Sequence, residues 1–73
     1  MYVTVVGIFD SVRLAEKAKG ALLAAGVLER RVDVTRDGDD YRVAVRADSS
    51  FERGRIRELL VQHGASSTEQ RSA

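Results

Sequence analysis

The residues that could support catalysis in this chain are one histidine and several serines. Nucleophilic catalysis by a serine needs a base held beside the hydroxyl, and His63 is the only histidine. His63 precedes Gly64 at the end of a helical pattern, where a histidine commonly interacts with the free carbonyls of the last turn. We therefore expect His63 to have a structural role, and we expect the chain not to be an enzyme.

The acidic residues Asp37, Asp39 and Asp40 surround Gly38 and suggest calcium binding. A calcium loop also requires a distal glutamate at a fixed spacing, which this segment lacks. An Asp-Gly pair is instead typical of a tight turn. One histidine without any cysteine supplies too few ligands for an ordinary transition-metal site. We expect neither a metal nor another cofactor.

Three arginines, Arg31, Arg42 and Arg46, fall on the outward side of two neighbouring strand patterns. Sheet modules that bind RNA place aromatic side chains on their central strands. Here the outward face of these strands offers only one aromatic residue, Tyr2. The net charge is +1, from 12 basic and 11 acidic residues, whereas nucleic-acid binders carry a clear basic excess. We expect a solvated, partly paired arginine surface and no nucleic-acid partner.

The first half of the chain has the pattern of a buried strand followed by a helix. Residues 2–9 are apolar on both faces, with Val3, Val5 and Phe9 on one and Tyr2, Val6 and Ile8 on the other. Such a run is typical of a central strand. Asp10 or Ser11 is expected to cap the helix. Its apolar stripe comprises Leu14, Ala15, Ala18, Ala21, Leu22 and Ala25. Gly26 is expected to end it.

The second half of the chain predicts a hairpin and a second helix. Alternation places Val32 and Val34 inward within the strand pattern 29–36, and the turn 37–40 leads to a strand at 41–47. Asp33 is expected to pair with an arginine across the hairpin. Residues 49–52 have the spacing of a capping box, Gly64 ends the helix, and residues 65–71 form a weak edge strand.

This order of elements is β-α-β-β-α, with a final β, and it predicts an α+β fold. Right-handed connections would give a ferredoxin-like two-layer sandwich, with an antiparallel sheet and both helices on one face. We expect one domain at residues 1–71 and a frayed tail at 72–73. The absence of a long apolar run or a basic leader predicts no membrane span and a cytoplasmic location.

Four segments resemble bacterial general stress proteins, which contain the heat-induced stress protein domain. They are residues 5–11 (VVGIFDS), 23–27 (LAAGV), 43–48 (VAVRAD) and 58–65 (ELLVQHGA). That family often carries a glycine-rich hydrophobic insert, where this chain has only the turn 37–40. The resemblance implies a compact, stress-associated protein, and it supplies no catalytic residues.

A second resemblance is to the peptidoglycan-binding repeats of bacterial cell-division proteins. It rests on residues 3–9 (VTVVGIF), the alanine-bearing helix and residues 41–45 (YRVAV). Those modules hold glycan strands on one sheet face. The chain departs from them after Val45, where it lacks their glycine-led turn, and we expect no membrane tether.

A two-layer domain covers only one face of its sheet, so the first strand should leave apolar residues exposed. With the register above these are Val6 and Ile8; with the opposite register they are Val3, Val5 and Phe9. Exposed apolar patches mark interaction surfaces, and short chains without disulfides often gain stability by association. The candidate interaction face comprises Tyr2, Thr4, Val6, Ile8, Arg31, Arg42, Ala44 and Arg46.

These observations predict a small non-catalytic interaction or regulatory module. It would act through a homodimer or a protein partner, without a defined molecular activity. The alternative is a polymer-binding module that uses the open sheet face, with peptidoglycan glycan strands favoured over RNA.

Overall fold

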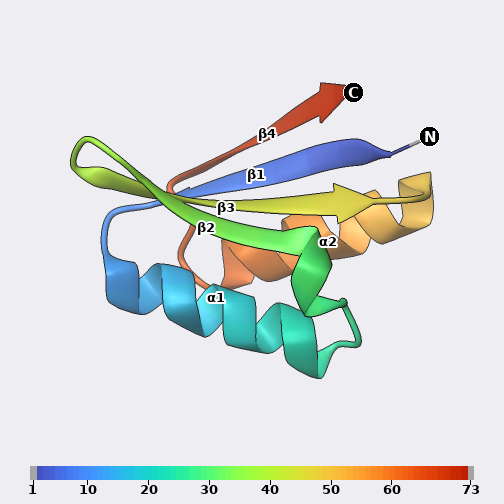
Figure 1. Ribbon diagram of the computed structural model, residues 1–73, viewed down its shortest axis with the longest axis horizontal. Helices are drawn as coiled ribbons and strands as arrows, with labels where there is room; N and C mark the ends of the chain where they lie inside the picture. The colour runs from blue at the N-terminus through green and yellow to red at the C-terminus, as the bar shows by residue number, and fades with distance from the viewer. Residues whose placement is uncertain (1, 73) are drawn as a thin grey trace.

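The computed structural model describes residues 2–72 and has an α+β architecture, as the sequence predicts (Figure 1). Its elements are β1 (Val3–Phe9), α1 (Val12–Ala24), a short 3₁₀ helix (Glu29–Arg31), β2 (Val32–Asp37), β3 (Asp40–Ala47), α2 (Ser50–Gln62) and β4 (Ser67–Ser72). The final strand therefore runs through Ser72, one residue beyond the expected domain boundary, and Ala73 lies outside the described residues.

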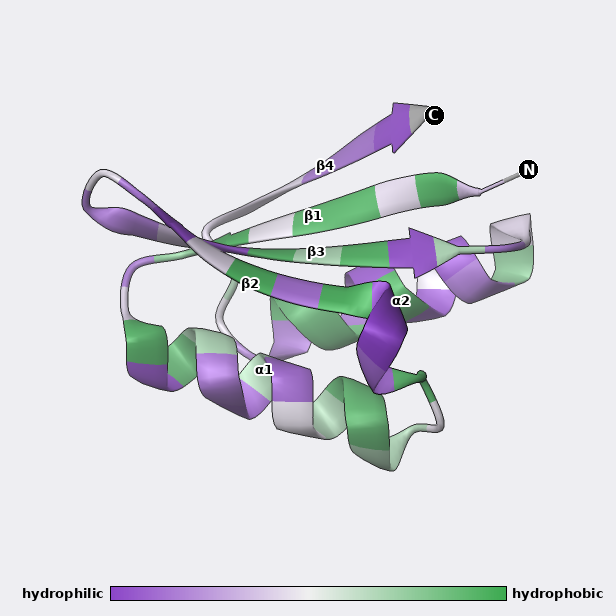
Figure 2. Ribbon diagram, viewed as in Figure 1, coloured by the Kyte–Doolittle hydropathy of each residue, from purple (hydrophilic) through white to green (hydrophobic). Residues whose placement is uncertain are grey.

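The four strands form one sheet in the order β2-β3-β1-β4. All three neighbouring pairs are antiparallel, and β1 is hydrogen-bonded on both sides, with Val5 opposite Val45 of β3 and Gln70 of β4. In Figure 2, β4 is hydrophilic along most of its length, whereas β1 is largely hydrophobic. The chain has thus placed its most apolar strand in the centre and a polar strand at an edge.

The core lies between the sheet and the two helices. Val5 and Phe9 of β1 belong to one cluster of buried side chains, which resolves the register of β1 in favour of these two residues facing inward. The other members come from both helices and the remaining inner strands: Ala15, Ala18, Leu22, Val32, Val43, Val45, Ala47, Ile56 and Leu60. Ala25 was expected in the stripe, but it is exposed because it forms the C-cap beyond the last turn of α1.

Helix α1 begins and ends through local hydrogen bonds. Ser11 is the N-cap, and its Oγ accepts a hydrogen bond from the Leu14 N–H at 3.2 Å. At the other end, the Gly26 and Val27 N–H groups donate to the carbonyls of Leu23 and Leu22, at 3.1 and 3.0 Å. This double closure is a Schellman motif, and it turns the chain back toward the sheet.

Helix α2 is closed in the same way. The Gly64 N–H donates to the Val61 carbonyl at 3.1 Å, and the Ala65 N–H donates to the Leu60 carbonyl at 3.0 Å. Nδ1 of His63 lies 2.8 Å from the carbonyl oxygen of Leu59, which agrees with the structural role expected for this histidine. The chain then continues directly into the edge strand β4.

Replacing Gly64 with alanine should lower the free energy of unfolding by about 1–2 kcal/mol. Gly64 has a φ of 96°, a backbone region that side-chain-bearing residues rarely adopt. The matched control is Gly20→Ala, because Gly20 lies within α1 and an added Cβ would have no neighbour within 4 Å. Gly20→Ala should instead raise stability by about 0.5–1 kcal/mol. Urea unfolding measures both, and equal effects of the two substitutions would contradict the assigned helix end.

Two details of the predicted hairpin are wrong. The segment before β2 is a 3₁₀ turn rather than a strand, because the Arg31 N–H donates to the Leu28 carbonyl at 2.9 Å. Asp33 makes no ion pair within residues 2–72; instead, Asp37 pairs with Arg42 at 2.9 Å. The register explains this difference, since Asp33 lies opposite Ala44. The turn itself is confirmed, with Asp37 and Asp40 paired around its two central residues.

Candidate interaction site

The strand residues of the predicted face lie together on the outward side of the sheet. The register pairs Thr4 with Arg46, Val6 with Ala44, and Ile8 with Arg42. Arg31 belongs to the 3₁₀ helix instead of a strand, but its guanidinium carbon lies 5.4 Å from the centre of the Tyr2 ring. The structure therefore brings the predicted residues into one neighbourhood, with Arg31 at its margin.

The expected exposure of Val6 is wrong, because only 3% of its surface is accessible. Val6 sits in the central strand, flanked in register by Ala44 of β3 and Glu69 of β4. Cross-strand neighbours at this spacing cover one another. Ile8 is half-buried for the same reason, with Arg42 and Ser67 on either side. The outward face is consequently less apolar than the alternation of β1 indicates.

The arginines of this face already have partners within the chain. Arg42 forms its ion pair with Asp37, and Arg46 donates to the Arg30 carbonyl at 3.0 Å. On the edge strand, Arg71 pairs with Glu69 at 3.1 Å. Both guanidinium groups of the strand arginines are therefore partly engaged within the chain, Arg42 by a carboxylate and Arg46 by a backbone carbonyl, which leaves less of this face free to bind a charged polymer.

Among residues 2–72, the most exposed large apolar side chain is that of Phe51, with 75% of its surface accessible. It belongs to the first turn of α2 and lines a groove of about 350 Å³ that runs between this turn and the end of α1. Leu28, 49% exposed, lines the same groove. The remaining lining residues are Ala25, Gly26, Val27, Arg31, Ser49, Glu52, Arg55, Ile56 and Leu59. We call this site the α1–α2 groove.

Phe51 points away from the core because of its position on the helix. Ile56 and Leu60 are the buried residues of α2, and position 51 is displaced from Ile56 by about 140° around the helix axis. The sequence contained this signal, since the capping box fixes where α2 begins and therefore which face residue 51 occupies. The second wall, formed by the loop around Leu28, could not be inferred because it comes from a distant segment.

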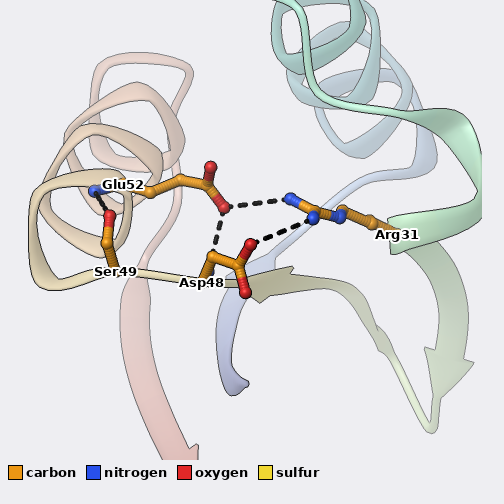
Figure 3. Close-up of polar contacts among 4 residues, drawn as sticks. All are labelled: Arg31, Asp48, Ser49 and Glu52. Carbon is orange, nitrogen blue, oxygen red and sulfur yellow. Dashed lines mark hydrogen bonds and ion pairs between the residues drawn. The ribbon is translucent and has the colours of Figure 1, made fainter. Parts of the chain in front are cut away.

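Three of the residues that line the groove, Arg31, Ser49 and Glu52, belong to a cluster of polar contacts with Asp48 (Figure 3). Nη1 of Arg31 lies 3.2 Å from Oε1 of Glu52, and Nη2 lies 3.4 Å from Oδ2 of Asp48. The same Oε1 of Glu52 accepts a hydrogen bond from the Asp48 N–H at 3.0 Å, while the Glu52 N–H donates to Oγ of Ser49 at 3.1 Å. The capping box is thus formed, although Glu52 reaches back one residue further than expected.

This cluster holds the guanidinium of Arg31 in place. Desolvation acts to lower the pKa of Arg31, but Tyr2, Glu52 and Asp48 together raise it above its ordinary value. Only 21% of the Arg31 side chain is accessible, so its guanidinium is held by the two carboxylates rather than offered to solvent. The cluster therefore joins the 3₁₀ helix to the start of α2.

A double-mutant cycle should detect this link. We expect Arg31→Met and Glu52→Gln to show a coupling free energy of about 0.5–1 kcal/mol, because both groups are partly solvated. Glutamine keeps an acceptor for the Asp48 N–H, so the cycle reports mainly on the charge. Urea unfolding at low salt measures the coupling, which should fall in 1 M NaCl. Additive effects at low salt would show that the cluster is not formed in solution.

Within residues 2–72, no group of three or more histidine, cysteine or acidic side chains is placed to hold a metal ion. In the same part of the chain, no helix is long and apolar enough to cross a membrane. Comparisons with protein-family models, curated proteins and solved structures find no match to this chain. The two resemblances noted in the sequence therefore stay predictions.

Proposed function

We propose that the chain is a non-catalytic interaction module that acts through a homodimer or a protein partner. The observation that carries this proposal is the exposure of Phe51 beside the α1–α2 groove. A single exposed apolar residue is common on protein surfaces. Here, however, Phe51 and Leu28 are two exposed apolar side chains on one concave site of mixed polarity, which is an arrangement that interaction surfaces favour.

The architecture proposed for this module is the ferredoxin-like sandwich. The element order β-α-β-β-α-β and the strand order β2-β3-β1-β4 support it. The burial of residues from both helices in one cluster with the inward side chains of β1 supports placing both helices on one face. In such a domain the α1–α2 groove lies on the helical layer, away from the outward sheet face.

We further propose that the module is associated with bacterial stress responses and acts in the cytoplasm. This part rests on the segments that resemble general stress proteins. Its test is complementation of a deletion strain of the native host after heat shock. We expect rescue of survival by the native chain and by the control Val61→Ser, whose side chain is exposed outside the groove. Phe51→Ser should not rescue, and full rescue by Phe51→Ser would refute the role of the groove.

The polymer-binding alternative stays a prediction with a direct test of its own. Retention of the purified chain on isolated peptidoglycan, and loss of that retention in an Arg42→Ala, Arg46→Ala variant, would support it. We expect no retention, because both arginines already bind groups within the chain.

A further inference from the structure

We propose that the α1–α2 groove is occupied by a second copy of this chain, with each copy inserting its Phe51 into the groove of the other. The inference rests on the proposed function, because it names the partner of the same site. Two copies related by a two-fold axis must present self-complementary patches to each other. Phe51 and the groove supply both halves of such a patch, a projecting ring and a hollow, on one surface.

The dimensions of the groove suit an aromatic side chain. Its volume of about 350 Å³ is at the lower end of the range for sites that bind small organic groups. Val27, Leu28 and Leu59 give it apolar walls. Inserting a phenylalanine ring removes about 150–250 Å² of apolar surface from water. Because the exchange is symmetric, one encounter buries both rings.

The charges at the groove are complementary to those of a second copy. Arg31 is already bound to Glu52 and Asp48, so the cation left at the rim is Arg55, which makes no ion pair within residues 2–72. Glu52 binds Arg31 and the Asp48 N–H through Oε1, which leaves Oε2 to accept from a second cation. If the two α2 helices approach antiparallel with the two-fold axis between positions 52 and 55, Oε2 of Glu52 in each copy faces Arg55 of the other.

The overall charge and size of the chain also permit this association. Its net charge of +1 gives little repulsion between two copies. A standard interface covers about 800 Å² per partner, which is about one-sixth of the accessible surface of 4595 Å². The groove and both of its walls must then be covered together. We expect a dissociation constant on the order of micromolar, because the patch has one aromatic anchor per copy.

Sedimentation equilibrium of the purified chain, from about 1 µM to 1 mM, tests the proposal. The native chain should reach twice its mass of 8.0 kDa. Phe51→Ser should raise the dissociation constant at least tenfold, and Val61→Ser should leave it unchanged. Circular dichroism checks that each variant is folded, which we expect since both side chains are exposed. A native chain that stays monomeric at 1 mM, or equal behaviour of the two variants, would overturn the proposal.

A photo-crosslinking amino acid at position 51 locates the contact. p-Benzoylphenylalanine keeps an aromatic ring at this position, and mixing isotopically light and heavy chains identifies cross-links between copies. We expect intermolecular cross-links to residues 25–28 and 56–59. Intermolecular cross-links confined to the outward sheet face would overturn the proposed geometry.

The dimer and the proposed function can fail separately. If the native chain is monomeric but Phe51→Ser still fails to rescue the deletion strain, the dimer is wrong and the interaction site stands. If the chain dimerises through Phe51 but Phe51→Ser rescues fully, the dimer is right and the proposed function is wrong.

Discussion

Replacing Leu60 with alanine is expected to remove about 2–5 kcal/mol from the free energy of unfolding. Leu60 of α2 is fully buried and belongs to the core cluster. A domain of this length has a total stability of only about 4–11 kcal/mol. The substitution should therefore leave the protein marginally folded at 25 °C, as measured by urea unfolding.

The packing of Leu60 against Gly7 makes this prediction specific. A Cβ added at Gly7 would lie 3.1 and 3.2 Å from the two δ-methyl carbons of Leu60, and 3.1 Å from Cε1 of Phe9. Gly7→Ala alone should therefore lower the free energy of unfolding by about 1–3 kcal/mol, because the added methyl overpacks the core. In a Leu60→Ala background the added methyl enters vacated space, so this loss of stability should be smaller by about 1–2 kcal/mol.

If Gly7→Ala lowers the free energy of unfolding by the same amount with and without Leu60, α2 does not lie against the centre of β1 as described. Should Leu60→Ala be too unstable to measure, Leu60→Val provides the second background, since it also withdraws the δ-methyl groups from Gly7.

The second large effect is expected in the concentration dependence of thermal unfolding. Anything that binds only the native state stabilises it by mass action. For a dimer above its dissociation constant, a hundredfold rise in concentration adds about 1.4 kcal/mol per chain. For a domain of this size that corresponds to an increase in Tm of about 6–11 °C.

Phe51→Ser should lower the Tm at each concentration and delay its rise to higher concentrations, because its dissociation constant is higher, whereas Val61→Ser should behave like the native chain. Differential scanning calorimetry from tens of micromolar to millimolar concentrations measures the Tm of the native chain and of both variants. A native Tm that does not change over this range would contradict self-association.

The local features of the fold follow directly from the sequence. Ser11, Gly26 and Gly64 act on backbone groups only a few residues away, so their roles can be inferred from spacing alone. The hairpin turn is similarly local. The central position of β1 also agrees with the sequence, because a continuous apolar run is typical of a central strand.

The features that sequence reasoning missed depend on distant segments. Val6 is buried because β4 brings Glu69 alongside it, and no local pattern predicts that neighbour. Arg31 is drawn from the expected strand face toward Asp48 and Glu52. Both shifts reduce the apolar and cationic character of the outward face.

Phe51 combines a local feature that the sequence predicts with a tertiary feature that it does not predict. Its exposure could be inferred from the start of α2, but its significance depends on Leu28 and the loop after α1, which form the facing wall. An exposed aromatic residue alone is unremarkable. The tertiary fold turns it into one edge of a concave site.

The most direct test is an isotope-filtered NOE experiment on an equimolar mixture of labelled and unlabelled chains at millimolar concentration. The proposed exchange of Phe51 between two copies predicts intermolecular NOEs between the Phe51 ring protons of one copy and the methyl groups of Val27, Leu28 and Leu59 of the other. Intermolecular NOEs that instead join Val6 or Ile8 of the two copies, or the absence of any intermolecular NOE, would contradict it.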